Sequence, residues 1–264
     1  MTDSPATRIR EVSAFVPLPL DRLTPDAPDG HYCLDGACES SVLVLRGVLA
    51  ASPSDTAALE AYMANDTLVP RTPNPMNPTT FLLRKQATFG AKYAFSKQAN
   101  AFVPGPPSAW PQVVADALTL AQEIAAVKGI ATEYYSGVHC NLYPSGKAGV
   151  QPHADNEPHL LPGLPIVSCT LLAGVHRARP FAIYLPPRKK GAAPEVVAEV
   201  LLGHGDVVVM QGRMQQAFLH GVAPTTKAEY RHAARINLTV RAFDPDLQRR
   251  LDGDDARPAK TAKA

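Results

Sequence analysis

The feature of this sequence that most restricts its fold is a series of short apolar segments in the second half. From about residue 130 onward, these segments are rich in β-branched residues and end at turn residues, as in "PIVSCTLLAG", "PFAIYLP" and "ARINLTVRAF". Such runs predict strands, and because no helix-length stretch separates them, a parallel βαβ sheet is disfavoured. We therefore predict a mainly β protein with supporting helices, built as a sandwich, jelly roll or barrel.

The first half of the chain supplies the supporting helices. In "SPSDTAALEAYMAN", Ser52 is placed to cap a helix, with Pro53 in the first turn and Asp55 completing a capping box. A second apolar stripe with helical spacing begins near Ser108 and stops at Lys128, directly before a glycine. We expect both helices to pack as supports for the strands.

The length of 264 residues suits a single domain. Residues 1–38 mix proline, acidic and basic residues without sustained periodicity, and residues 244–264 end in a polar sequence. We therefore expect a domain at 39–243 between a flexible N-terminal extension and a disordered C-terminal tail. The formal charge of +2 does not by itself indicate a nucleic-acid or membrane partner.

The four cysteines, Cys33, Cys38, Cys140 and Cys169, show no CxxC spacing. This fits reduced thiols in a reducing compartment better than a disulfide framework or a zinc site. No run reaches the roughly 20 apolar residues of a membrane helix, and no apolar core follows a basic start. The sequence thus predicts a soluble, intracellular protein without a membrane partner, and it does not distinguish the cytoplasm from the nucleus.

Polar side chains alternate along several of the predicted strands. Successive residues of a strand face opposite sides, so the polar residues of "RINLTVR" share one face and its apolar residues share the other. A surface strand would alternate in the same way, but the pattern recurs in "HCNLYP" and in "PHADNEP". The residues that share these polar faces are Asn141, Tyr143, His153, Asp155, Arg235, Asn237, Thr239 and Arg241. This recurrence suggests a barrel whose interior holds a polar ligand.

The pair His153 and Asp155 has the His-x-Asp spacing of a facial iron site, in which two histidines and one carboxylate leave the opposite positions open. Such a pair also occurs in solvated loops, so the third ligand matters. His204 lies between glycines in "LLGHGDVVVM" and fits a turn residue bonded to its neighbours. His220, in "MQQAFLHGVAP", has an apolar approach that suits a strand end. We therefore predict His220 as the third ligand.

Two arginines on the polar face of the last strand could anchor a dicarboxylic keto acid. The guanidinium groups of Arg235 and Arg241 can each grip a carboxylate through two parallel hydrogen bonds, which a lysine cannot do. The alternative is that one of them forms a structural ion pair with Asp206 or Glu229.

The segments "RKQATFG", "NLYPSG", "HADNEP", "GHGDVVVMQG", "FLHGVAP" and "RINLTVR" follow one another between about residues 70 and 243. In this order they resemble the AlkB family of Fe(II)- and 2-oxoglutarate-dependent nucleic-acid dioxygenases. The resemblance implies a double-stranded β-helix (jelly-roll) core, with Fe(II), 2-oxoglutarate and O2 as cofactor and cosubstrates. The "GVHRARPF" segment is longer than the family pattern, so Arg177 and Arg179 compete for one family position.

The resemblance also assigns roles to residues. His153, Asp155 and His220 would hold the iron. The residues implied to bind 2-oxoglutarate are Asn141, Tyr143, Arg235, Asn237 and Arg241, with Arg235 at the distal carboxylate. The residues implied to contact the substrate are Tyr93, Phe95, Glu157, Arg84 and Lys85. Ordinary core packing is the alternative for the two aromatic residues.

The implied reaction is oxidative demethylation of N-alkylated bases in DNA or RNA, such as 1-methyladenine and 3-methylcytosine, with release of formaldehyde, succinate and CO2. The segment "NPMNPTTFLL" lacks an evident aromatic wedge for opening a duplex, so single-stranded nucleic acid is the favoured partner, and duplex stays possible. We expect a monomer. Two alternatives are a hydroxylase of the same chemistry that acts on another kind of substrate, and a non-catalytic reader of modified nucleic acid.

Overall fold

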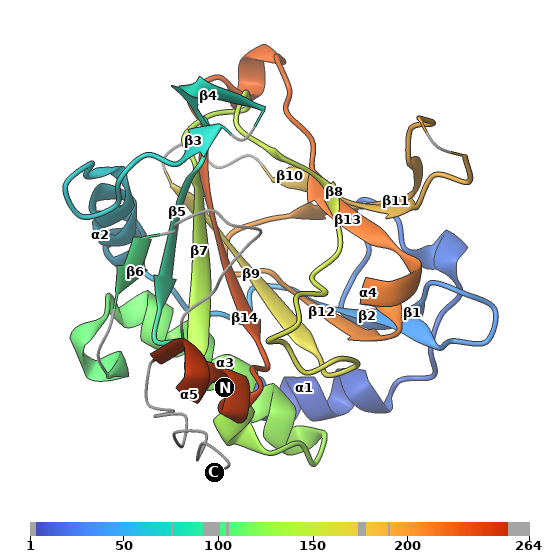
Figure 1. Cartoon of the computed structure of the whole chain (residues 1–264). Coiled ribbons are helices and arrows are strands. Elements are labelled where there is room, and N and C mark those ends of the chain that lie inside the picture. The colour runs from blue at the N-terminus through green and yellow to red at the C-terminus, as the bar shows by residue number, and fades with distance from the viewer. Residues whose placement is uncertain are drawn as a thin grey trace, which may run out of the picture.

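The computed structural model describes residues 4–74, 76–91, 101–103, 106–173, 178–189 and 191–252. Two sheets form its frame (Figure 1). The eight-stranded sheet has the order β1 (Gly30–Cys33), β2 (Ser40–Leu45), β12 (Val207–Gly212), β9 (Ile166–Ala173), β14 (Ala234–Arg241), β7 (Gly137–Tyr143), β5 (Lys85–Phe89) and β6 (Ala101–Val103). The four-stranded sheet has the order β11 (Glu195–Leu202), β10 (Arg179–Leu185), β13 (Leu219–Val222) and β8 (Val150–His153).

The remaining elements are short or peripheral. A two-stranded sheet pairs β3 (Pro73–Asn74) with β4 (Asn77–Phe81). The α-helices are α1 (Pro5–Ala14), α2 (Pro53–Ala64), α3 (Gln112–Val127), α4 (Met214–Ala217) and α5 (Pro245–Asp252). The 3-10 turns are η1 (Leu20–Arg22), η2 (Pro107–Ala109), η3 (Thr132–Tyr134) and η4 (Ala228–Tyr230). Within the described part of the chain, no helix combines the length and the apolar character needed to cross a membrane.

Nearly all strand pairs are antiparallel, and the pair of β5 with β6 is parallel. The two large sheets face each other, and the prediction of a mainly β protein with a jelly-roll core is confirmed. β14 lies between β7 and β9, with Arg235 opposite Tyr143 and Asn237 opposite Asn141. Because residues opposite each other in a ladder point to the same side, the polar faces of these strands merge into one surface inside the fold.

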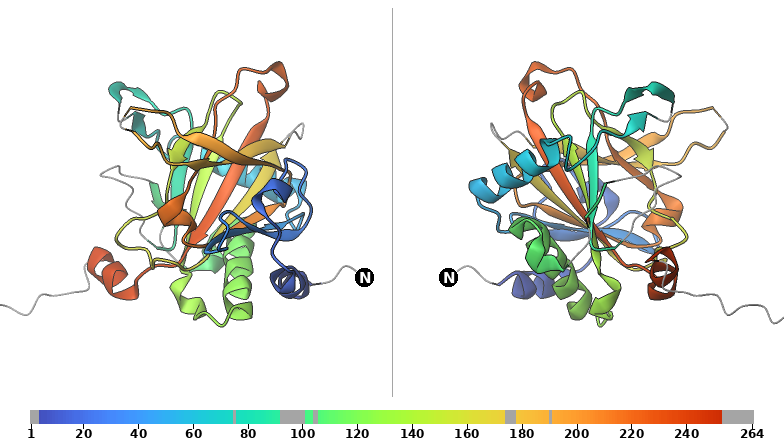
Figure 2. Two further views of the ribbon diagram at one scale, coloured as in Figure 1. Left: turned by 90° about the vertical axis from the view of Figure 1, so that its right-hand side faces the viewer. Right: turned by 60° about the vertical axis from the view of Figure 1, so that its left-hand side comes forward.

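The outer face of the large sheet is apolar and is covered by helices (Figure 2). Ile236, Leu238 and Val240 of β14 are fully buried there, in a core that includes the apolar sides of α2 and α3. Ser52 is confirmed as the N-cap of α2, because its hydroxyl accepts from the amide of Asp55. The Asp55 carboxylate turns back to the same hydroxyl and accepts from it at 2.6 Å. The sheet thus has a dry outer side and a largely polar inner side at β14 and β7.

The helix α3 begins later than predicted. Residues near Ser108 form the 3-10 turn η2, and Pro111 occupies the N-cap, so the helix starts at Gln112. Its end is as predicted, with Lys128 as C-cap and Gly129 at a φ of 68°, where a side chain would be strained.

A second apolar core lies between the sheets at their other end. Val42 and Val44 of β2 and Val208 of β12 pack there against Phe181 and Ile183 of β10. The interior is therefore apolar beneath β2 and β12 and polar beneath β14, β7 and β5, which confines a polar ligand to one part of the fold.

The N-terminal segment differs from the flexible extension that the sequence suggested. Ser4 caps α1 with its side chain, and Ile9 and Val12 of this helix are buried in the core that also contains α3. Farther along, β1 pairs with β2, with Tyr32 fully buried. Only two residues of α1 face the core, so no long apolar period marks the helix in the sequence. At the C-terminus α5 covers part of the expected tail, and residues 253–264 lie outside the described residues.

The cysteines correct a second expectation. Cys33 and Cys38 form a disulfide with a Cα–Cα distance of 4.8 Å, although all four cysteines were expected to be reduced. The reason is the turn after β1, which reverses the chain and brings the two residues together across a spacing that is no recognised motif. Cys140 and Cys169 are free and buried.

Candidate active site

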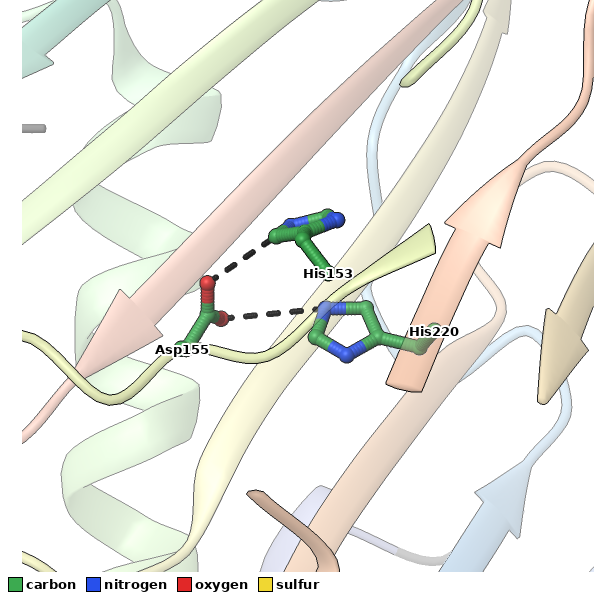
Figure 3. A group of neighbouring side chains, drawn as sticks. All are labelled: His153, Asp155 and His220. Atoms are coloured by element: carbon green, nitrogen blue, oxygen red, sulfur yellow. Dashed lines mark ion pairs between the residues drawn. The ribbon is translucent and has the colours of Figure 1, made fainter. Parts of the chain in front are cut away.

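Three side chains with metal-ligating atoms meet at the edge of the four-stranded sheet. His220 of β13 lies directly opposite His153 of β8, and Asp155 follows just after β8 ends. Nε2 of His153 lies 3.7 Å and Nε2 of His220 lies 3.8 Å from the Asp155 carboxylate oxygens. All three ligating atoms fall within 4.8 Å of one another, and Figure 3 shows the side chains turned toward a common point. This geometry can hold a metal ion with two nitrogens and one oxygen.

Neighbouring groups orient the two imidazoles. Nδ1 of His153 lies 2.9 Å from the carbonyl oxygen of Gln151, which can only accept, so this bond requires the proton on Nδ1 and directs Nε2 toward the metal position. The ring of His220 stacks on Phe181 at a centroid distance of 5.6 Å. Burial, followed by the nearby His153, lowers the pKa of His220 to about 3. Burial and the nearby His153 thus favour the neutral form of the His220 imidazole, in which one ring nitrogen can bind a metal.

The carboxylate of Asp155 is buried and paired. Nη2 of Arg241 lies 2.9 Å from its Oδ2. Burial alone would raise the pKa of Asp155, but Arg241 and the two histidines outweigh it and hold this pKa well below the usual range. The carboxylate is therefore ionised at neutral pH. Asp206, one of the acids considered as a partner for the inner arginines, instead pairs with Arg46 at 2.7 Å.

Arg235 lies deeper in the same pocket and is almost wholly buried, with 1% of its surface exposed. Its Nη2 donates to the hydroxyl of Thr170 at 2.9 Å, and its Cζ lies 5.5 Å from the ring centroid of Tyr143. Its Nε and Nη1 atoms have no hydrogen-bond partner among the described residues. Burial lowers the pKa of Arg235 to about 10, so the group stays charged. A buried guanidinium with unused donors is costly unless a ligand binds it, and a carboxylate fits that fork.

The two amides assigned to the cosubstrate lie opposite each other but differ in their contacts. Nδ2 of Asn237 donates to the Ser168 hydroxyl at 2.8 Å and to the Cys169 carbonyl at 3.0 Å, and its oxygen accepts from Thr239. The Oδ1 atom of Asn141 has no hydrogen-bond partner among the described residues. Asn237 thus ties the pocket floor together, and Asn141 offers its amide to a ligand.

The structure separates two neighbouring residues that were both assigned to the substrate. Arg84 lines the pocket, with Nη1 3.3 Å from the carbonyl of Gly149. Lys85 points to the other side of β5, where its Nζ pairs with Asp66 and donates to the carbonyl of Ala64, both at 2.6 Å. The alternation of side chains along a strand explains this correction. Lys85 lies away from the pocket.

The remaining substrate assignments have different outcomes. Glu157 lines a hollow of about 240 Å³ beside the three ligating residues, together with Asp155, Met210 and Arg241. Tyr93 and Phe95 lie outside the described residues.

Of the two arginines that compete for one family position, Arg177 also lies outside the described residues. Arg179 is buried and donates to the carbonyl oxygens of Ala148 and Ala223, each at 3.0 Å. It therefore joins two loops at one end of the pocket.

His139 is a pocket residue that the sequence reasoning missed. It lies on β7 and is 5% exposed, with Nδ1 3.1 Å from the hydroxyl of Thr88. Burial lowers its pKa to about 3, and the positive charge of Arg241 acts in the same direction. Strand alternation, which had identified Asn141 and Tyr143, also places His139 on their face, so the signal was present in the sequence.

The buried His139 predicts that acid weakens the fold. The unfolded chain protonates this histidine near pH 6.5, but the folded protein does so only near pH 3. Between these values the unfolded state binds more protons, so the free energy of unfolding falls as the pH falls. From pH 7 to pH 5 we expect His139 to contribute a loss of about 2 kcal/mol.

Urea unfolding of the metal-free protein at both pH values measures this loss. A His139→Leu variant should lose about 2 kcal/mol less between the two pH values than the parent. Substitution of the exposed His232 by glutamine serves as the control. An equal pH dependence in the parent and in His139→Leu would contradict the expectation.

Comparison with known proteins adds three findings. The family model described as the 2OG-Fe(II) oxygenase superfamily matches residues 47–241. The alpha-ketoglutarate-dependent dioxygenase alkB homolog 3 of Homo sapiens is 32% identical over 113 residues, and that of Bos taurus is 33% identical; each match covers 42% of this chain and 38% of the relative. This chain therefore matches well under half the length of these relatives. A prolyl-4-hydroxylase structure from Pseudomonas putida matches with a TM-score of 0.42 and 17% identity, over 77% of this chain and 92% of that chain.

Proposed function

Because the chain belongs to the 2OG-Fe(II) oxygenase superfamily and is AlkB-like, we propose that it demethylates N-alkylated bases in nucleic acid. The observation that carries this proposal is the shared pocket of the three ligating side chains and Arg235. When bound, Fe(II) with 2-oxoglutarate and O2 supplies the oxidation of an N-methyl group, with formaldehyde, succinate and CO2 as products. The donor set fits this cofactor, since the two histidines and the carboxylate are the ligands of non-haem Fe(II) oxygenases.

The residues of this chain would divide the work of binding. His153, Asp155 and His220 would hold the metal. The free donors of Arg235 would take the distal carboxylate of 2-oxoglutarate, because a guanidinium binds a carboxylate through two parallel bonds. Tyr143 packs over that guanidinium and limits its rotation. Arg241 would keep Asp155 ionised before the metal arrives.

The substrate assignment rests on the hollow beside the metal ligands. Glu157 places a carboxylate there, and an exocyclic amino group of adenine or cytosine is a donor that a carboxylate accepts. Apolar side chains such as Leu160 and Met210 line the same hollow and suit the faces of a base. Arg84 lies at the neighbouring pocket and would face a phosphate or the base edge. Single-stranded DNA or RNA is the substrate that we propose, because its bases need no unpairing.

Product analysis tests this function directly. The protein is incubated with Fe(II), 2-oxoglutarate, ascorbate and oligonucleotides that carry 1-methyladenine or 3-methylcytosine, in single- and double-stranded form. Mass spectrometry should show loss of the methyl group from the single strand, with matching amounts of succinate and formaldehyde. Succinate release without any change in the oligonucleotides would instead favour a hydroxylase of another substrate class. Absence of both products with the metal-loaded protein would refute the proposal.

A further inference from the structure

Asp155 is buried but lies just beyond the end of a strand, where no ladder holds its backbone. It follows β8, which is the edge strand of the four-stranded sheet and pairs with β13 alone. That ladder ends at the pair of His153 with His220, so the strands do not fix the backbone at Asp155. The amide of Asp155 instead donates to Oε1 of Gln215 at 2.9 Å. One side-chain hydrogen bond thus holds the backbone of a metal-ligating residue.

Gln215 is itself held on a well-anchored segment. It belongs to α4, which connects β12 to β13 and leads directly to His220. Its Nε2 contacts Sδ of Met210 at 3.3 Å, and this contact sets which end of the amide faces Asp155. The two residues before Gln215 are fixed, because Met214 is buried in the second core and Arg213 binds Glu39 through backbone and side chain.

We infer that Gln215 is a positioning residue that aligns Asp155 with His220 for metal binding. The Asp155 carboxylate is drawn toward Arg241 at 2.9 Å, and this attraction alone does not favour the direction of the two imidazoles. Gln215 fixes the backbone from which the carboxylate projects. The side chain can then pair with Arg241 while it faces His153 and His220 (Figure 3). Because Gln215 and His220 lie on one short segment, two of the three ligands share a common support. This inference depends on metal binding and not on the nature of the substrate.

Metal affinity and amide exchange test the inference without turnover. Co(II) is titrated calorimetrically into the metal-free parent and into Gln215→Met, which keeps the length but removes the acceptor. We expect about 10-fold weaker Co(II) binding, the effect of losing a group that orients a metal ligand. Hydrogen exchange of the Asp155 amide in the metal-free protein should also become faster. Gln215→Asn, whose amide is too short to reach, provides a milder variant with the same expected direction.

Two further variants separate the hydrogen bond from a general effect on α4. Gln215→Glu retains an acceptor oxygen and should keep Co(II) affinity and amide protection close to those of the parent. Gln216→Met alters the exposed neighbour on the same helix and should change neither quantity. The inference is overturned if Gln215→Met binds Co(II) as the parent does, if Gln215→Glu is as weak as Gln215→Met, or if Gln216→Met is equally weak. A protein that binds Co(II) as expected but leaves methylated oligonucleotides unchanged would refute only the proposed function.

Discussion

Replacing Asp155 by alanine should abolish turnover and weaken metal binding by roughly 100-fold or more, since this removes the only anionic member of the ligand set. The substitution also removes the carboxylate that lies 2.9 Å from Nη2 of the buried Arg241. Loss of one member of a buried ion pair costs about 3–5 kcal/mol, so we expect a folded but less stable protein. The measurements are succinate formation, Co(II) affinity and urea unfolding.

A double variant separates the two effects of this substitution. Asp155→Ala combined with Arg241→Met removes both charges, so it should regain stability relative to Asp155→Ala without regaining metal affinity. If Asp155→Ala alone still turned over substrate, the assignment of the metal site would be wrong. Recovery of Co(II) binding in the double variant would show that the charge of Arg241, and not the lost ligand, had prevented binding.

Exchange of Arg235 for lysine should weaken 2-oxoglutarate binding by roughly 10- to 100-fold, because charge-assisted hydrogen bonds contribute about 1.5–3 kcal/mol. Lysine keeps a positive charge but cannot form two parallel bonds, and burial would favour its neutral form. The Nε and Nη1 donors that the structure leaves available are the groups that the variant loses. The quantity to measure is the 2-oxoglutarate concentration that gives half-maximal succinate release.

Arg46 provides a matched control for this substitution. It is a half-buried arginine, which pairs with Asp206 and donates to the carbonyl of Ala27, away from the pocket. Arg46→Lys should lower stability and leave the dependence on 2-oxoglutarate unchanged. If Arg235→Lys required no more 2-oxoglutarate than the parent, the role of Arg235 at the distal carboxylate would be contradicted.

Much of the fold could be predicted from the spacing of apolar residues and from the turn residues that separate the strands. The alternation in residues 235–241 placed Ile236, Leu238 and Val240 on one face, and these residues are fully buried beneath the helices. Strand alternation depends only on the backbone geometry of the strand itself, so it can be predicted without knowing which strands lie beside it. It also put His153 and Asp155 on one face, and the apolar approach to His220 pointed to the third ligand; the ligating atoms of the three lie within 4.8 Å.

The helix α1 and the disulfide were missed for different reasons. The helix α1 buries only Ile9 and Val12, too few for a visible apolar stripe. A local signal did exist, because Ser4 followed by Pro5 repeats the pattern of Ser52 and Pro53 that identified α2. The disulfide had no such signal, since only the pairing of β1 with β2 brings its two cysteines together.

The site residues likewise divide into those that the sequence could reveal and those that it could not. Pocket residues on regular strands, such as His139, could be found from the face they share with Asn141. The hydrogen bond from Asp155 to Gln215 could not, because α4 is a single turn whose placement depends on Glu39 and Arg213. Lys85 was misassigned because a sequence motif does not state which of its residues face inward.

The two free cysteines of the large sheet lie where reagents in solution do not reach them. Cys140 and Cys169 are neighbours in sequence of Asn141 and Ser168, yet their sulfurs lie on the opposite, apolar face. Burial raises the pKa of Cys169 to about 12, and it raises the pKa of Cys140 as well. Peroxides and alkylating agents attack the thiolate, and burial disfavours this anion at both cysteines. The sheet that bounds the ligand pocket on one face therefore also keeps both thiols away from solvent on the other.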